Sequence, residues 1–260
     1  MIHSVVYGQA SPVVSWHGKR ATDITEVEAY LRGRVLDRLR DKEDASAFKA
    51  DCLALSGTGM ARDTLEKLLC SERDEREPWE IGEALAECIL EDEGAKWPWN
   101  KERDKRTPQA SLPGADLVGF FQQNGRTLLA IGEVKTSEDT STPPKVMHGR
   151  TGMIYQLESL AHDTSKHLLI LRGLRVRCRD TECLPLWQQA VKTYLESGGK
   201  DLILFGVLMR DTEPHHLDMK NRADDLAASL TAPSRAELTV WYWPIGITKW
   251  PIILRGGPSS

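Results

Sequence analysis

The pattern of apolar and polar positions predicts a short strand or arm over residues 1–20, then a helical region, and then an alternation of helices and strands. Apolar residues recur at helical spacing over residues 25–40. A later helix is predicted to begin at Pro78 and end before Gly94, because proline suits the first turn of a helix and glycine its C-terminal cap. We therefore expect a mostly helical N-terminal lobe over residues 1–77, and a core with a C-terminal strand extension over residues 78–260.

A β-hairpin provides the first strands of this predicted core. Residues 116–121 and 127–135 have the composition of strands, and Asn124-Gly125 between them is a strong signal for a hairpin turn. The elements expected after the hairpin are a helix over 151–162, a strand over 167–171, a basic segment over 172–179, a helix over 185–196, a strand over 201–209, a helix over 222–230 and a strand over 236–244. Apolar strands separated by helices predict an α/β fold, in which helices flank a central mixed β-sheet.

Three charged residues of the hairpin are predicted to meet at one end of it. Asp116 opens the first strand, whereas Glu133 and Lys135 end the second. An antiparallel turn brings these two strand ends side by side. Side chains alternate along a strand, so Glu133 and Lys135 share a face. Two carboxylates and one ammonium group are therefore expected at one lip of the sheet.

Such a cluster suits the hydrolysis of phosphodiester bonds. Carboxylate oxygens bind Mg²⁺, while waters and a phosphate oxygen fill its remaining positions. A bound metal polarises the phosphate and acidifies a water, and a lysine can orient that water or stabilise the developing charge. A simpler interpretation is that Glu133 and Lys135 form an ordinary pair on the strand surface, worth a few tenths of a kcal/mol.

At these residues the chain resembles the PD-(D/E)xK, restriction-endonuclease-like nuclease superfamily. Pro113-Gly114-Ala115-Asp116 matches the loosely defined first carboxylate, and Glu133-Val134-Lys135 matches the E-x-K half of the motif. The resemblance implies a third metal ligand from the preceding helix, for which Glu83 is favoured over Glu87. It also implies a catalytic glutamine on the following helix, at Gln156. The expected metal is Mg²⁺ or Mn²⁺, held by Glu83, Asp116 and Glu133.

The charge balance gives no general attraction to nucleic acid. The chain has 34 lysines and arginines against 38 acidic residues, and a formal net charge of −4. DNA binding would then need a local basic surface or a partner. Arg175, Arg177 and Arg179 would share one face of an extended segment and could follow a DNA backbone, although a solvated strand or a partner contact fits the same pattern.

The remaining composition points to a cytosolic protein. No run approaches the roughly 18 apolar residues of a membrane span, and we expect no secretory signal at the start of the chain. The five cysteines are then expected to be reduced thiols, and they lack the spacing of a zinc site. Buried, unreactive cysteine is the preferred interpretation.

The layout of the whole chain resembles more particularly the nuclease subunits of Hachiman anti-phage defence systems. That resemblance implies a DNase that a DNA helicase partner holds inactive and releases when invading or damaged DNA is sensed. Three alternatives stay open. They are another defence or repair nuclease of this fold, a non-catalytic scaffold or nucleic-acid-binding subunit, and an unrelated α/β domain with an accidental acid-x-lysine triplet.

Overall fold

A mixed β-sheet lies at the centre of the computed structural model, which describes residues 2–70, 75–100, 103 and 114–257. The described residues form seven strands in the spatial order β1-β2-β7-β6-β5-β4-β3. These are β1 His3–Gln9, β2 Val14–Ala21, β3 Ala95–Lys96, β4 Leu117–Gln123, β5 Arg126–Ser137, β6 Leu202–Arg210 and β7 Arg235–Tyr242. Strands β5, β6, β7 and β2 run parallel, and antiparallel pairs close both edges. The prediction of an α/β fold with a mixed sheet is confirmed.

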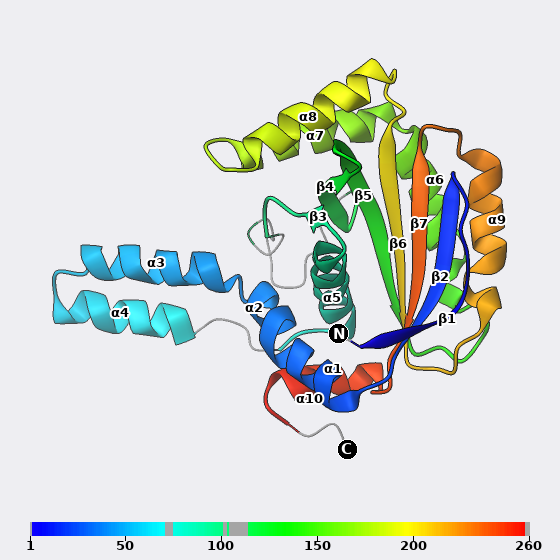
Figure 1. Ribbon diagram of the computed structural model, residues 1–260. Coiled ribbons are helices and arrows are strands. Elements are labelled where there is room, and N and C mark those ends of the chain that lie inside the picture. Colours follow the sequence, from blue (N-terminus) through cyan, green and yellow to red (C-terminus); the bar gives the residue numbers. More distant parts are fainter. Residues whose placement is uncertain (1, 71–74, 101–102, 104–113, 258–260) are drawn as a thin grey trace.

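Helices cover both faces of this sheet (Figure 1). One layer contains α1 Ile24–Tyr30, a π-helical turn Leu31–Val35, α2 Leu36–Leu39, α5 Pro78–Asp92 and α10 Trp250–Leu254. The other contains α6 Met153–His162, α7 Thr164–Cys178, α8 Leu184–Glu196 and α9 Lys220–Ser229. Helices α3 Lys42–Leu55 and α4 Gly59–Cys70 form a hairpin outside both layers. Short 3-10 turns lie at Lys145–Met147, His216–Asp218 and Ile247–Lys249.

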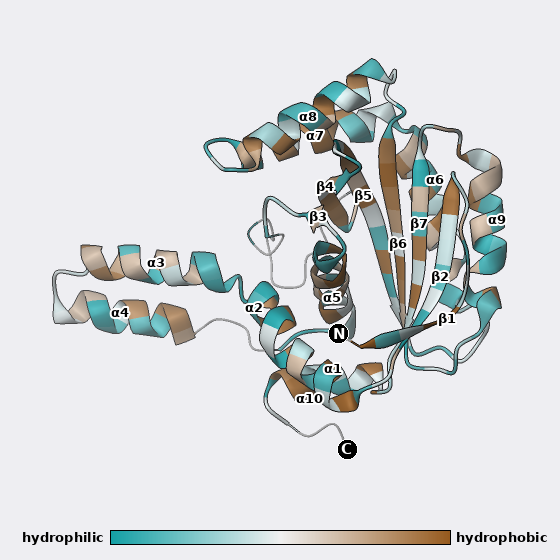
Figure 2. Ribbon diagram, viewed as in Figure 1, coloured by the Kyte–Doolittle hydropathy of each residue, from teal (hydrophilic) through white to brown (hydrophobic). Residues whose placement is uncertain are grey.

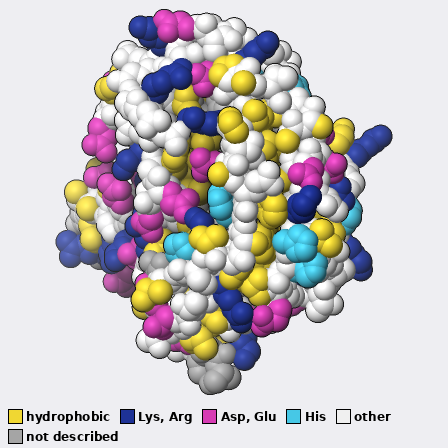
Figure 3. Space-filling view, turned by 45° about the vertical axis from the view of Figure 1, so that its right-hand side comes forward, with side chains coloured by type: hydrophobic (Ala, Val, Ile, Leu, Met, Phe, Trp, Pro, Cys, Tyr) yellow, Lys and Arg dark blue, Asp and Glu magenta, His cyan; other side chains and the backbone are white. Residues whose placement is uncertain are grey.

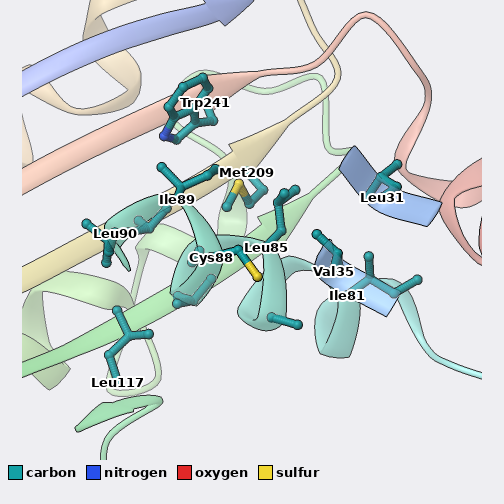
Figure 4. Packing of buried hydrophobic residues seen from close by; sticks show 14 of the residues in the cluster. Leu31, Val35, Ile81, Leu85, Cys88, Ile89, Leu90, Leu117, Met209 and Trp241 are labelled. Atoms are coloured by element: carbon teal, nitrogen blue, oxygen red, sulfur yellow. The ribbon is translucent and has the colours of Figure 1, made fainter. Parts of the chain in front are cut away.

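The core divides between the two faces because side chains alternate along the strands. On β5, Leu128 and Ala130 pack with α5, whereas Leu129 and Ile131 pack on the opposite face. Figure 4 shows the α5 layer, where residues of α5 contact the π-helical turn and the sheet. Strand β6 is buried along its whole length and is hydrophobic throughout most of it (Figure 2). A central strand that is buried on both faces explains why its sequence shows no polar alternation.

The β4–β5 hairpin forms as predicted. Asn124 and Gly125 have φ values of 52° and 74°, so both occupy the left-handed region that a two-residue hairpin turn requires. Strand pairing runs from Gln123 opposite Arg126 to Leu117 opposite Gly132. This register places the start of β4 beside the end of β5.

The expected strand at residues 167–171 is wrong, and residues 172–178 of the basic segment are not extended, because helix α7 runs from Thr164 to Cys178. Asp163 caps this helix by accepting hydrogen bonds from the backbone N–H groups of Ser165 and Lys166. The side chains that α7 buries are His167, Leu174 and Cys178, whose spacing of seven and four residues is helical. The arginines at 175, 177 and 179 therefore do not share a face.

The described residues of the N-terminal region 1–77 contribute strands to the central sheet as well as helices. Strand β2 pairs in parallel with β7, from Val14 opposite Ala236 to Arg20 opposite Tyr242. The helices α1 and α2 bury Val27 and Leu39 in the same core as α5. Thus most of this region belongs to the main body, and only the α3–α4 hairpin projects from it (Figure 1).

The cysteines form no disulfide bonds among the described residues, where all five are free thiols. Cys88 and Cys178 are buried, and burial raises the pKa of each thiol to about 11. Both are therefore poor nucleophiles at neutral pH, since the thiolate is the reactive form. Cys70, by contrast, is exposed. Within the described part of the chain, each helix is too short or too polar to cross a membrane.

Candidate active site

Asp116 and Glu133 lie opposite each other where the β4–β5 ladder ends. Leu117 pairs with Gly132, so the next position on each strand sets these two acids side by side. Opposed residues of an antiparallel pair point to the same face of the sheet. The neighbouring strand β5 holds the Asp116 carboxylate in place, because Asp116 Oδ2 accepts a hydrogen bond of 2.9 Å from the backbone N–H of Val134. The predicted meeting of these carboxylates is present in the structure.

Glu133 is buried, with 2% of its surface exposed. The pKa of its carboxyl group is raised to about 8, first by burial and then by the neighbouring charge of Asp116, whereas Lys135 acts in the opposite direction. The charged form of Glu133 would therefore be poorly solvated, and it would lie next to the negative charge of Asp116. A cation placed between the two carboxylates would relieve both effects.

Lys135 occupies the same face of β5 as Glu133, as the alternation of side chains predicts. Its Nζ donates a hydrogen bond of 3.4 Å to Glu133 Oε2. The lysine side chain is 19% exposed, compared with 2% for the glutamate. The ammonium group therefore lies at the mouth of the cluster, between the buried carboxylate and solvent.

Gln156 lies on α6, which packs on this face of the sheet next to Glu133. Gly206 is the strand neighbour of Glu133. A Cβ built on Gly206 would meet Leu157 Cδ1 and Met153 Sδ at 3.0 Å, so α6 approaches the sheet over this glycine. The neighbouring Gln156 has a buried Oε1 with no hydrogen-bond partner among the described residues. A buried carbonyl oxygen without a partner is unusual and suits a ligand or water.

The two candidate glutamates on α5 differ in their surroundings. Glu87 is buried and lines a cavity that Asp116 also lines. Arg38 Nη1 lies 3.7 Å from Glu87 Oε2, which supplies a structural partner for this carboxylate. Glu83 is only partly buried and does not line that cavity. The structure therefore brings Glu87, the less favoured of the two, toward Asp116.

The acidic groups suit Mg²⁺, which keeps water ligands, better than they suit a metal whose ligands all come from the protein. In the described ranges, no three His, Cys, Asp or Glu side chains gather closely enough to hold a metal ion. Mg²⁺ keeps several waters and is usually bound through one or two carboxylates together with substrate phosphates. The pair Asp116 and Glu133 matches that requirement. The side-chain oxygen of Gln156, which has no hydrogen-bond partner among the described residues, is a further uncharged oxygen on the same face.

The cavity beside Asp116 was not predicted from the sequence. Its far wall comes from α7 and includes Lys166 and Arg177, on either side of the strand expected at residues 167–171. The helical spacing of these residues and the capping aspartate Asp163 were the signals that could have revealed it. No family model matches the chain, and no curated protein matches it. The function is therefore inferred from the chemistry of the chain's own residues.

Proposed function

We propose that the chain is a nuclease that hydrolyses DNA phosphodiester bonds with Mg²⁺ or Mn²⁺. The observation that carries this proposal is the opposed pair Asp116 and Glu133 with Lys135 beside it, since the pKa of Glu133 is raised by burial and by Asp116. In this proposal Asp116 and Glu133 hold the metal. The bound metal would polarise the scissile phosphate and acidify an attacking water.

The other residues of the site contribute position and charge. Lys135, at the exposed side of Glu133, is suited to orient the attacking water or to stabilise negative charge that develops on the phosphate. The Gln156 Oε1 would accept a hydrogen bond from a metal-bound or attacking water, which supplies the partner it lacks among the described residues. Glu87 would support the site from α5 while it remains paired with Arg38.

We further propose that a DNA helicase partner controls this nuclease in prokaryotic anti-phage defence, as the resemblance to Hachiman nuclease subunits implies. The net charge of −4 supports a partner that strengthens the binding of DNA to the chain. Figure 3 shows basic and acidic side chains intermixed over one face, without an extended basic patch there. The projecting α3–α4 hairpin also exposes apolar side chains, including Leu55 at 85% and Met60 at 81%, and such surfaces are typical of interaction sites.

The direct test is cleavage of fluorescent single- and double-stranded DNA by the full chain in Mg²⁺, Mn²⁺ and EDTA. The assay is repeated with any DNA helicase that co-purifies with the chain. Glu133→Gln and Lys135→Ala are expected to abolish cleavage without loss of folding, and the exposed Glu138→Gln serves as a matched control. Undiminished cleavage by both site variants would exclude the site assignment.

A second candidate function is a non-catalytic, nucleic-acid-binding subunit that keeps the nuclease fold. The lack of a three-residue ligand group among the described residues favours this alternative. It predicts DNA binding without cleavage in either metal. It also predicts that Glu133→Gln leaves the biological activity of the complex intact, whereas the nuclease proposal requires that activity to disappear.

A further inference from the structure

A cavity of about 430 Å³ opens beside Asp116, between α7 and the segments that surround β4. This volume lies within the range of roughly 300–1,000 Å³ that is usual for small-ligand sites. Asp116 and Glu87 lie on one side of it, and the lining also includes apolar side chains such as Val118 and Ile170. The cavity therefore combines apolar walls with one of the two proposed metal ligands, Asp116, in its lining.

Helix α7 presents one stripe of residues to this cavity. Lys166, Ile170, Gly173 and Arg177 follow one another at intervals of four, three and four residues, which is the spacing of a single helix face. The two cations therefore lie on the wall that α7 forms, whereas the acidic residues come from α5 and from the residue before β4. Gly173 lies between them, and a Cβ added there would meet no atom within 4 Å. The absence of a side chain in the middle of the stripe thus enlarges the space.

Trp99 supplies an aromatic ring to the same cavity. The guanidinium of Arg103 lies over this ring, 4.8 Å from its centroid, and Arg103 is in turn held by Asp41. One face of the indole is therefore covered and its position is supported. The indole N–H is buried and has no hydrogen-bond partner among the described residues. An aromatic ring with a free donor is suited to contact a planar, polar ligand.

We propose that this cavity receives one unpaired nucleobase of the DNA strand being cut. The base packs against Trp99, while Lys166 and Arg177 bind its flanking phosphates. This inference rests on the proposed nuclease function for the identity of the ligand, and it deepens that function by assigning the substrate as single-stranded or unpaired DNA. The adjacency of Asp116 places the bound base next to the phosphate at the metal site.

The chemistry of the walls distinguishes an unpaired base from other occupants. Single-stranded nucleic acids are bound by aromatic rings that stack with bases and by cations that follow the backbone. The cavity presents both an aromatic ring and cations, and its acidic residues include the proposed metal ligand Asp116. This arrangement suits a DNA strand, whose negative backbone would be bound by the cations while one phosphate approaches the metal. In a paired duplex the bases are stacked inside and cannot enter a lateral cavity without being extruded.

The test measures DNA binding in the absence of cleavage. The full chain is titrated in EDTA, and again with Ca²⁺ in place of Mg²⁺, against a fluorescein-labelled oligonucleotide of about 12 nucleotides, in the size range of single-strand binding sites. The probes are the single strand, its blunt duplex and a set of single strands that each carry one abasic nucleotide. We expect the single strand to bind more tightly than the duplex, and one abasic position to weaken binding roughly ten-fold.

Two variants connect this effect to the cavity. Gly173→Leu fills the space from a helical position where leucine is favourable, so it is expected to fold and to lose the preference for the single strand. Trp99→Leu is expected to remove the abasic effect, whereas Trp99→Phe retains most of it. The matched control is Val176→Leu, which adds bulk to α7 at a residue that is 66% exposed and outside the cavity. Thermal melts establish that each variant is folded.

The outcomes separate this inference from the nuclease proposal. Single-strand preference that disappears in Gly173→Leu, without any cleavage in Mg²⁺, would support the base pocket and contradict the nuclease. Cleavage that is equal for single strand and blunt duplex, and unchanged in Gly173→Leu, would overturn the pocket and leave the nuclease standing. Failure of the wild-type chain to bind the single strand in both EDTA and Ca²⁺ would also overturn the pocket.

Discussion

Asp116 lies opposite Glu133 at the end of the β4–β5 ladder, and its negative charge is one reason that the pKa of Glu133 is raised. Burial is the larger cause. A fold that only needed a polar residue at this position could use a neutral amide at lower cost, because an amide carries no charge to desolvate. The retention of two adjacent carboxylates is therefore explained more simply by a cation than by stability.

The first prediction concerns the stability of the metal-free protein as a function of pH. The folded pKa of Glu133 is about 8, above the ordinary 4.5, so the folded state binds more protons than the unfolded state between these values. The contribution of this carboxyl group to stability is complete below pH 4.5 and is lost as pH rises toward 8. The Glu133→Gln variant does not lose stability in this way, because glutamine does not ionise. It should exceed the wild-type free energy of unfolding at pH 8 by about 1 to 3 kcal/mol, measured by denaturant titration in EDTA.

Two comparisons make this prediction specific. The advantage of Glu133→Gln should shrink toward pH 5, and Glu138→Gln, at an exposed position just beyond β5, should show no such trend. Mg²⁺ should raise the melting temperature of the wild-type protein but not that of Glu133→Gln, because a ligand stabilises the state that binds it. Equal stability of the wild-type and Glu133→Gln proteins at pH 5 and pH 8 would contradict the assigned environment of Glu133.

The second prediction separates Lys135 from the metal ligands. Lys135→Ala should reduce cleavage by roughly 100-fold or more, the range found when a group that stabilises transition-state charge is removed. Its melting temperature should still increase with Mg²⁺, since the carboxylates remain and a competing cation has been removed. The exposed Lys192→Ala should cleave at the wild-type rate. A Lys135→Ala variant that loses the Mg²⁺ response would mean that the lysine acts through metal binding or folding instead.

The hairpin and its charged end could be predicted from sequence because the information is local. The Asn124-Gly125 turn determines which residues are opposite, and alternation along β5 places Glu133 and Lys135 on one face. Both arguments need only a turn type and a strand period. The approach of α6 over Gly206 depends on packing between segments far apart in the chain, and no local pattern encodes it.

The basic segment was misassigned because a short apolar run fits a buried strand and a helix equally well. Leu169 illustrates the ambiguity, since it follows the pattern of a core residue and is 68% exposed. Tertiary contacts decide the outcome, as His167 hydrogen-bonds to the Tyr194 hydroxyl of α8 at 2.7 Å. A strand at residues 167–171 would not form the cavity beside Asp116, because helix α7 places Leu169 and Ile170 in its wall together with Lys166 and Arg177.

The third prediction tests the close approach of α6 to the sheet. In Gly206→Ala the new Cβ would meet Leu238 Cδ2 at 2.6 Å and atoms of Leu157 and Met153 at 3.0 Å. We expect a loss of about 1 to 3 kcal/mol in the free energy of unfolding, as for other overpacked cores. Cleavage should also fall to the extent that α6 shifts to relieve these contacts, because α6 carries Gln156. Gly33→Ala, where the new Cβ meets nothing within 4 Å, should be neutral or slightly stabilising. Unchanged stability in Gly206→Ala would refute this packing.

The fourth prediction assigns the α3–α4 hairpin to the helicase partner. Helix α3 buries none of its residues, and α4 buries only Leu65, so the exposed apolar side chains on this projecting hairpin do not stabilise the main body. The double substitution Leu55→Glu and Met60→Glu should therefore change the free energy of unfolding by no more than about 0.5 kcal/mol. It should nevertheless weaken association with a co-purifying helicase, measured by size-exclusion chromatography of the mixed components.

A matched substitution distinguishes this hairpin from any exposed apolar residue. Leu195 on α8 is 65% exposed, so Leu195→Glu makes the same chemical change at a comparable surface position, away from the hairpin. It should leave the complex with the helicase intact. Loss of the complex with Leu195→Glu but not with the hairpin variant would place the partner on the α7–α8 side instead. Such a partner would then lie beside the wall of the proposed base cavity, and its binding would compete with single-stranded DNA.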